Sequence, residues 1–424
     1  MKLIKTTFFS ALITFIRIAS GFVAGKVVAT LTGASGVAII GAFVNFITIV
    51  LTFANGAINT GVIKYTAENN QTESKLKSLF STALKISIYC SGFTGIILLS
   101  CSSILSDWIF KTEAYSGPIG LLGLTIVFYS LNTLLISILN GKGEIKIYTI
   151  VNGLGSVVGL ILTIVLVWFY KIKGALYAMV LAQSIVFFVT VFLISKSSWF
   201  SYDYFRQKFD RSIAVKLSHY SLMAIISAIV VPLSQIILRN IIIDKIGINQ
   251  AGYWQGMMRI SDGYLMLITT ALSTYYLPKL SSLNSNIEIR KEIFKGYSIL
   301  IPTVFIGCCI IYFLRFIIIR ILYTPDFLIM EKLFIWQMAG DFLKICAWIL
   351  SYLMLAKAMT KIFIITEIIF SLSYVFLGYF FIGQYNLVGI SMAFALNYLI
   401  YLLVMALIFK KLLFKTALGA NESQ

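Results

Sequence analysis

The stretch FIWQMAGDFLKICAWILSYLMLAKAMTK, residues Phe334–Lys361, predicts a membrane-spanning helix that carries charges. Its apolar run is long enough to cross a bilayer core of about 30 Å. Asp341 and Lys344 stand three residues apart within it, so they share one helix face and can partly neutralise each other. Ionised side chains are costly in hydrocarbon, and such a pair is therefore a functional-site hypothesis by default.

The same stretch has a counterpart in the first half of the chain, LLISILNGKGEIKIYTI (134–150). At an offset of about 215, Lys142 matches Lys357, Lys146 matches Lys361, and Gly174 matches Gly389. With an even number of spans in each half, the offset predicts a parallel repeat about an axis along the membrane normal. Many secondary transporters are built in this way.

Composition places the whole chain in the membrane. Of its 424 residues, 59% are hydrophobic and 12% are charged, about half the charged fraction of a soluble protein. The net charge of +18 does not indicate a nucleic-acid partner. Basic residues in membrane proteins set topology and face anionic lipid, so membrane lipids are the expected partner of this charge.

The chain is expected to form an all-α polytopic membrane protein with about twelve transmembrane helices. The predicted spans are 8–31, 36–63, 79–105, 118–140, 147–170, 174–195, 217–238, 252–278, 296–321, 332–356, 362–383 and 388–409. Residues 196–216 mix aromatic and basic side chains and predict an amphipathic, partly helical cytoplasmic linker. The predicted organisation is a six-helix lobe (1–195), this linker, a second six-helix lobe (217–409) and a cytoplasmic tail (410–424).

Loop charge predicts the orientation. With a cytoplasmic N-terminus, 21 of the 34 lysines and arginines fall in cytoplasmic segments and seven on the opposite side. Cytoplasmic loops carry an excess of basic residues. Both termini are therefore expected in the cytoplasm.

Two bases, Arg17 and Lys26, lie in the first predicted span. Nine residues make about two and a half helical turns, so the two side chains point in different directions. In one interpretation, Lys26 extends toward the outer interface and Arg17 pairs within its own half. In the other, both line a cavity that accepts a polyanion, because guanidinium and ammonium groups are the usual partners of phosphate oxygens.

Further charges lie in the spans of the second half. Arg259 and Asp262 stand three residues apart, as Asp341 and Lys344 do, and each pair is either structural or part of a working site. Glu367 lies just inside the eleventh span, consistent with an interfacial position. Three acids inside the spans stand against six bases, which favours an anionic cargo; the bases are Arg17, Lys26, Lys85, Arg259, Arg315 and Lys344.

Several motifs resemble those of the Wzx-type flippases. They are FIWQMAGDFLK (334–344), YLMLAK (352–357), ISDGYLMLIT (260–269), YYLPKLS (275–281) and TGVIKYTAE (60–68). The similarity covers essentially the whole chain and is typical of O-antigen and enterobacterial common antigen (lipid III) flippases. These belong to the multidrug/oligosaccharidyl-lipid/polysaccharide exporter superfamily. Arg17 stands where a close relative carries lysine, and Arg259 replaces a small polar residue.

The resemblance implies two six-helix lobes around a V-shaped central cavity, in a Gram-negative inner membrane. It also implies alternating access and export of an undecaprenyl-diphosphate-linked oligosaccharide, with the polymerase and chain-length regulator of the same pathway as further partners. Substrate-binding residues are expected at Arg17, Lys26, Lys64, Arg259 and Lys344. Coupling residues are expected at Asp341, Asp262 and Glu367. No cofactor is expected, and the membrane potential or a proton gradient would drive transport.

Two other functions fit a polytopic membrane protein. A membrane enzyme such as an O-antigen polymerase would need a sizeable extracytoplasmic loop and an acid–base or nucleophile constellation there, and the predicted loops are short. A drug or cation antiporter of the same fold would favour acidic groups over the excess of bases found inside the spans.

Overall fold

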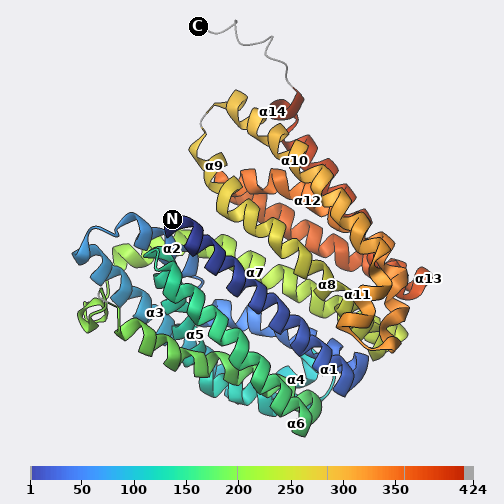
Figure 1. The fold of residues 1–424 in the computed structure, drawn as a ribbon, viewed down its shortest axis with the longest axis horizontal. Coiled ribbons are helices and arrows are strands. Elements are labelled where there is room, and N and C mark those ends of the chain that lie inside the picture. Colours follow the sequence, from blue (N-terminus) through green and yellow to red (C-terminus); the bar gives the residue numbers. More distant parts are fainter. Residues whose placement is uncertain (1, 198, 284, 358, 415–424) are drawn as a thin grey trace, which may run out of the picture. The chain divides into compact units, whose positions relative to one another are not determined.

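The computed structural model describes residues 2–197, 199–283, 285–357 and 359–414, and regular structure in these ranges is helical (Figure 1). Of the predicted tail, residues 415–424 lie outside the described residues. Eight described helices are long and apolar enough to cross a membrane. The predicted class, an all-α polytopic membrane protein, is therefore confirmed. Contacts divide the chain into two units, residues 1–236 and 237–424.

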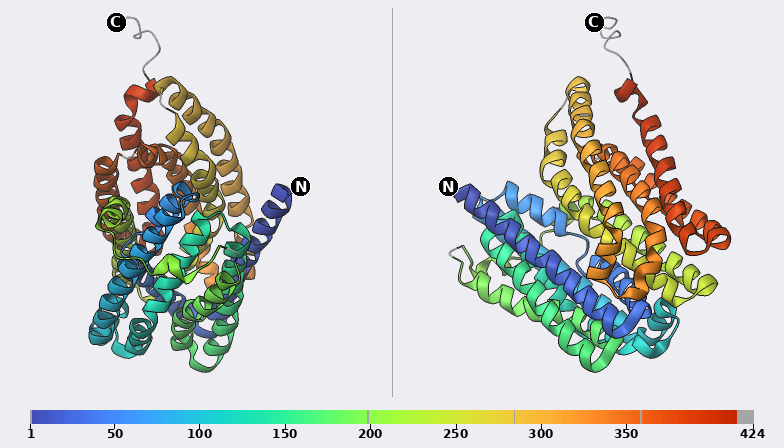
Figure 2. Two further views of the ribbon diagram at one scale, coloured as in Figure 1. Left: turned by 90° about the vertical axis from the view of Figure 1, so that its left-hand side faces the viewer. Right: turned by 45° about the vertical axis from the view of Figure 1, so that its right-hand side comes forward.

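The first unit is a bundle in which α1 packs against α6, α3 against α5, and α5 against α6; α1 and α6 run side by side in Figures 1 and 2. Its elements are α1 (Lys2–Ala54), α2 (Asn59–Glu68), α3 (Glu73–Ser100), α4 (Ser102–Phe110), η1 (Glu113–Tyr115), α5 (Ser116–Gly141), α6 (Ile145–Ser195), η2 (Tyr202–Phe205) and the first part of α7 (Arg211–Ile246).

Close packing of α3 on α5 depends on two glycines. A Cβ atom on Gly95 would lie 2.6 Å from the Gly123 carbonyl oxygen, and one on Gly123 would lie 2.9 Å from that of Gly95. Only glycine, whose side chain is a hydrogen atom, is small enough at these two positions. Small residues usually allow such close contact where membrane helices cross.

The second unit packs α12 against α13 and α10. It holds the rest of α7, then α8 (Ile248–Ala271), the π-helix η3 (Leu272–Tyr276), α9 (Leu277–Ser282), α10 (Asn286–Phe313), α11 (Arg315–Leu322), η4 (Pro325–Leu333), α12 (Phe334–Ala356), α13 (Thr360–Ile408) and α14 (Lys410–Phe414). The unit boundary falls inside α7, so the contacts group the predicted linker with the first unit.

The predicted repeat is visible in the backbone of each unit. Helix α6 breaks at Lys171 (φ 50°, ψ −129°) and α13 breaks 215 positions later at Asn386 (φ 51°, ψ −139°). Three residues after each break, a Cβ atom on Gly174 or Gly389 would lie 1.9 or 2.2 Å from a backbone carbonyl oxygen. Each half therefore contains the same helical hairpin, turned by the same backbone conformation and closed by a glycine.

Several predicted spans have different bounds in the structure, and two of them affect the charged residues or the helix order. The span 36–63 ends at Ala54, because Gly56 and Ala57 adopt positive φ and interrupt the helix before α2. The span 296–321 begins at Asn286 and is interrupted at Leu314. Arg315 therefore opens α11, where its Nε lies 3.8 Å from Glu331 Oε2.

The predicted span 217–238 stops one residue before Arg239, but the helix in the structure is longer. Helix α7 continues to Ile246, and the Arg239 side chain is 1% exposed within it. Its Nη1 donates a hydrogen bond to Asn240 Oδ1 at 3.1 Å. The second unit thus contains a buried guanidinium that the predicted span left out.

The linker 196–216 is tied to α3. Ser81 Oγ donates to the Tyr204 carbonyl oxygen (3.1 Å) and accepts from the Gln207 amide (2.9 Å). The ring of Tyr204 is buried against Phe80, with centroids 5.7 Å apart. The predicted partly helical linker contains the 3-10 turn η2, and these bonds hold it against the first unit.

Candidate functional sites in the two units

The first unit has an open cavity of about 530 Å³ between α1, α5 and α6. Small residues leave this space open: the wall includes Gly21 and Ala24 on α1, and Gly155, Gly159 and Ala182 on α6. No heavy atom lies within 4 Å of a Cβ placed on Gly21. The cavity is thus built from missing side chains, within the size range of small-molecule sites.

Among the described residues that line this cavity, Arg17 is the one that carries a charge. Neutral polar groups from the same helices share the wall: Ser20, Thr48, Asn152, Ser156, Thr163 and Gln183. A guanidinium binds phosphate or carboxylate through a two-pronged fork. Amide and hydroxyl groups both donate and accept hydrogen bonds, as the hydroxyl groups of a sugar require.

The side chain of Gln183 in the cavity wall is held by a chain of hydrogen bonds through buried residues outside the wall. Asn132 Nδ2 on α5 donates to Gln183 Oε1 at 3.3 Å, and Asn132 Oδ1 accepts from Thr190 Oγ1 at 2.7 Å. Asn132 and Thr190 are both fully buried. This chain of hydrogen bonds fixes one polar group of the wall before any ligand arrives.

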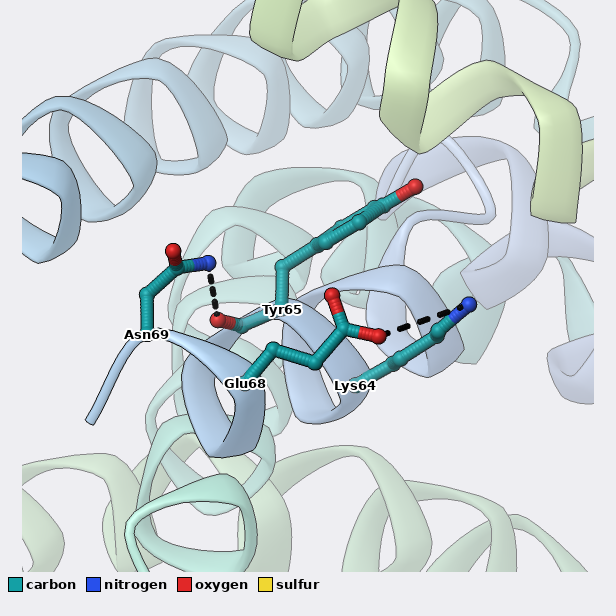
Figure 3. Close-up of polar contacts among 4 residues, drawn as sticks. All are labelled: Lys64, Tyr65, Glu68 and Asn69. Atoms are coloured by element: carbon teal, nitrogen blue, oxygen red, sulfur yellow. Dashed lines mark hydrogen bonds and ion pairs between the residues drawn. The ribbon is translucent and has the colours of Figure 1, made fainter.

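The structure places Lys26 and Lys64 away from this cavity wall. Lys26 is exposed on α1 and is not a lining residue. Lys64 lies on α2, where its Nζ is 3.6 Å from Glu68 Oε1, one helical turn further on (Figure 3). Asn69 closes the same helix by donating to the Tyr65 carbonyl oxygen at 2.8 Å. Of the three bases predicted as binding residues in the first unit, Arg17 alone thus lines the cavity.

Asp341 is the centre of a buried polar cluster in the second unit. Its side chain is fully buried on α12. Oδ2 accepts hydrogen bonds from Ser261 Oγ (2.6 Å) and from the hydroxyl group of Tyr264, both on α8. Gln337 Nε2, one turn earlier on α12, lies 3.4 Å from Oδ1. The carboxyl group is therefore held by three donors from two helices.

Lys344 has a different environment one turn along the same helix. It is 9% exposed, and its Nζ lies 4.7 Å from the ring centroid of Trp348, 5.8 Å from Phe394 and 5.7 Å from Tyr398. These distances fall within the range of cation–π attraction. Among the ion pairs of the described residues, none within 4.0 Å joins Lys344 to Asp341. The two charges share a helix face but have separate partners.

The other predicted site residues of this unit lie on its helices and differ in solvent exposure. Arg259 is half-buried on α8, Asp262 is exposed on the same helix, and Glu367 is half-buried on α13. Their roles in binding or coupling stay predictions.

Sequence reasoning missed the neutral partners of these sites. Ser261 and Tyr264 stand three residues apart in ISDGYLMLIT, and Gln337 stands four residues before Asp341, so helical spacing could have indicated them. The ion pair of Lys64 and Glu68 has the same i, i+4 signal. No comparable signal marks Asn152 or Gln183, which packing alone brings to the cavity.

Comparisons with known proteins agree with this architecture. Residues 36–331 match the family model described as "Polysaccharide biosynthesis protein". The proteins named "Lipid III flippase" of Escherichia coli (strain K12) and of Shigella flexneri are each 27% identical to this chain over 402 residues. Each alignment covers 95% of this chain and 96% of the relative.

Two solved structures share the fold. An inward-facing multidrug resistance MATE family transporter of the MOP superfamily superposes with a TM-score of 0.78 at 13% identity, covering 95% of this chain and 96% of that one. The lipid II flippase MurJ, in an inward closed conformation, gives a TM-score of 0.74 at 18% identity, covering 95% of this chain and 87% of MurJ. At these identities the likeness shows the fold.

Proposed function

The chain belongs to this family of polysaccharide biosynthesis proteins, and on that premise we propose that it is a flippase for a lipid-linked oligosaccharide. The cargo is an undecaprenyl-diphosphate-linked glycan, moved from the cytoplasmic to the periplasmic leaflet of the inner membrane by alternating access. Similarity to lipid III flippases along 95% of the chain supports this function. A transporter is supported over a membrane enzyme such as an O-antigen polymerase.

The observation that carries the proposal is the chemistry of the cavity in the first unit. One guanidinium, on Arg17, stands among amide and hydroxyl groups and apolar wall residues. A cargo with an anionic diphosphate, a row of sugar hydroxyl groups and a hydrocarbon chain presents the complementary groups. An organic cation would meet a charge of its own sign, so a drug antiporter of the same fold is the weaker candidate.

Within this proposal, Arg17 binds the diphosphate, with Asn152 and Gln183 on the first sugars. Lys344 and Arg259 are proposed as further positively charged contacts along the path of the cargo. Lys26 and Lys64 are proposed to attract the anionic cargo at the two ends of this path. Asp341, Asp262 and Glu367 are proposed to balance the charge of these bases when the cavity is empty. No cofactor is needed, because the membrane potential favours outward movement of an anion by about 2.3 kcal/mol per charge per 100 mV.

We propose that both termini lie in the cytoplasm, supported by the excess of lysine and arginine in the corresponding loops. Reporter fusions at Gly143 and within residues 196–216 should then report the cytoplasm. Fusions near 107–117 and at Pro325 should report the periplasm. A periplasmic signal from the linker would overturn the proposed orientation.

Substitution of Arg17 tests the site. In a deletion strain, Arg17→Ala should reduce surface glycan at least tenfold, and undecaprenyl-linked glycan should accumulate on the cytoplasmic leaflet. Arg17→Lys should restore part of the display, because the charge is kept and the fork is lost. Lys173→Ala, which removes an exposed charge outside the cavity wall, is the control.

Protein abundance is checked by blot for every variant. Full display with Arg17→Ala at normal abundance would contradict recognition of the diphosphate by this residue. If deleting the gene leaves every lipid-linked glycan unchanged, the flippase proposal itself fails.

A further inference from the structure

The second unit contains another pocket, of about 600 Å³, at one end of its helices. Its wall comes from the start of α10, the end of α12, the turn before α13 and the segment that joins α13 to α14. Figure 1 shows α14 and the start of α10 at the same end of this unit. The pocket shares no lining residue with the clusters around Asp341 and Lys344, so the sites described above do not account for it.

Three bases line this pocket: Arg290, Lys357 and Lys411. In the described part of the chain, no aspartate or glutamate lines the pocket, although Glu288 and Glu292 lie on the same helix as Arg290. The ammonium group of Lys357 is held in place by a hydrogen bond to the Leu283 carbonyl oxygen. The pocket therefore has a positive wall with one base already fixed.

The start of α10 adds to this charge. Asn286, its first residue, lines the pocket, and Ser285 Oγ caps the helix by accepting from the Ile287 amide at 3.3 Å. The N-terminal end of a helix carries a partial positive charge. Bases and helix end together favour an anion in this space.

The rest of the wall is apolar. Leu353 and Phe409 are buried residues whose surfaces face the pocket, and Ile408 beside them is partly exposed. Leu353 belongs to one apolar span and Ile408 ends another. This wall offers nothing to a small inorganic anion, but it suits the hydrocarbon next to an anionic headgroup.

We propose that this pocket binds an anionic phospholipid of the surrounding membrane. Its phosphate lies among Arg290, Lys357 and Lys411, and the first carbons of its acyl chains lie against Leu353, Ile408 and Phe409. Basic pockets at the ends of membrane helices are suited to anionic headgroups. This lipid is a resident of the second unit and is distinct from the transported cargo, so the inference does not depend on the flippase function.

Native mass spectrometry of the full-length protein in detergent tests the proposal. The protein is titrated with phosphatidylglycerol, and separately with phosphatidylcholine of the same acyl chains. Wild-type protein should retain one phosphatidylglycerol in preference to phosphatidylcholine. In the triple variant Arg290→Gln, Lys357→Gln, Lys411→Gln this preference should vanish. Each base near a headgroup contributes about 1 kcal/mol, which is about fivefold in affinity.

The matched control removes three other bases from the same end of the unit: Lys279→Gln, Lys291→Gln, Lys361→Gln, none of which lines the pocket. It changes the net charge equally and should keep the bound lipid. An equal loss in both triple variants would assign the attraction to the basic face as a whole and overturn the proposal.

Single variants serve if the triple variant does not fold. Arg290→Gln and Lys411→Gln should each weaken phosphatidylglycerol binding about fivefold, and unchanged binding in both would overturn the proposal. Displacement of the lipid by millimolar inorganic phosphate would also overturn it, because a free anion would then be the true ligand. Displacement by equimolar undecaprenyl diphosphate would do the same, by showing that the pocket belongs to the cargo.

Discussion

Asp341 and Lys344 stand one turn apart on α12, yet they are held by different chemistry. Ser261, Tyr264 and Gln337 donate hydrogen bonds to the carboxyl group. Aromatic rings, of which Trp348 is nearest, surround the ammonium group. Donors stabilise a negative charge and ring faces stabilise a positive one. Each position is therefore adapted to the sign of its own residue.

Exchanging the two residues tests this adaptation. In the variant Asp341→Lys, Lys344→Asp, a carboxylate would face the negative surfaces of three rings, and an ammonium would face three donors. We expect glycan display below about one tenth of the parental level, as in either single variant. Each misplaced buried charge costs several kcal/mol. Lys344→Arg, which keeps a cation over the rings, should retain more display than the exchange.

Display in a deletion strain is the measurement, with abundance and membrane insertion checked for each variant. If the exchange restores display that both single variants lose, the two residues act as a simple ion pair. The proposed role of Asp341 in balancing the cavity charge would then be lost.

Between elements, α12 and α13 approach closely at Gly340. A Cβ atom there would lie 2.3 Å from Phe394 Cδ1 and 3.2 Å from the Ala395 Cα. Phe394 is buried and is also one of the rings around Lys344. A glycine in α12 thus positions an aromatic group of the site on α13.

Gly340→Ala should therefore disturb both packing and site. Overpacking of a filled core costs about 1–3 kcal/mol, so the thermal unfolding midpoint of the purified protein should fall. Adding Phe394→Leu, which makes room for the methyl group, should restore part of the lost thermal unfolding midpoint. The control is Gly383→Ala on exposed helix in α13, where alanine favours the helix. An unchanged midpoint for Gly340→Ala would contradict the close approach.

The elements were predicted from sequence more fully than their contacts. Long apolar runs mark the spans, and the apolar setting of Asp341 marks it as a candidate site. Its partner Ser261 lies 80 residues away, and only tertiary packing brings them together. A cavity lined by Arg17 was among the predictions, but the other residues of its wall were not, for a related reason. Gly155 and Gly159 are among the residues that line it, and absent side chains leave no charge pattern to detect.

The repeat that relates the two halves of the chain is a property of backbone geometry as much as of sequence. Lys171 and Asn386 are different residues, yet both adopt φ near 50° with strongly negative ψ. Lys142 and Lys357 each follow the last residue of the helix before the hairpin. The two halves therefore share the same hairpin but differ in their side chains, so that Arg17 lines a cavity in one half and Asp341 lies in a polar cluster in the other.

The shared turn predicts an unusual pair of stabilising substitutions. Positive φ costs a non-glycine residue about 1–3 kcal/mol, and glycine relieves this cost while adding some freedom to the unfolded chain. Lys171→Gly should therefore raise the thermal unfolding midpoint, with a net gain of about 1 kcal/mol. Asn386→Gly should raise it less, because asparagine tolerates positive φ better than lysine.

The controls Lys173→Gly and Gln384→Gly stand on exposed helical backbone beside each break, and there glycine should cost about 1 kcal/mol. Opposite signs within each pair, measured side by side on the purified protein, are the expected result. If the thermal unfolding midpoint of Lys171→Gly is lower than that of Lys173→Gly, the two hairpins do not share this positive-φ turn.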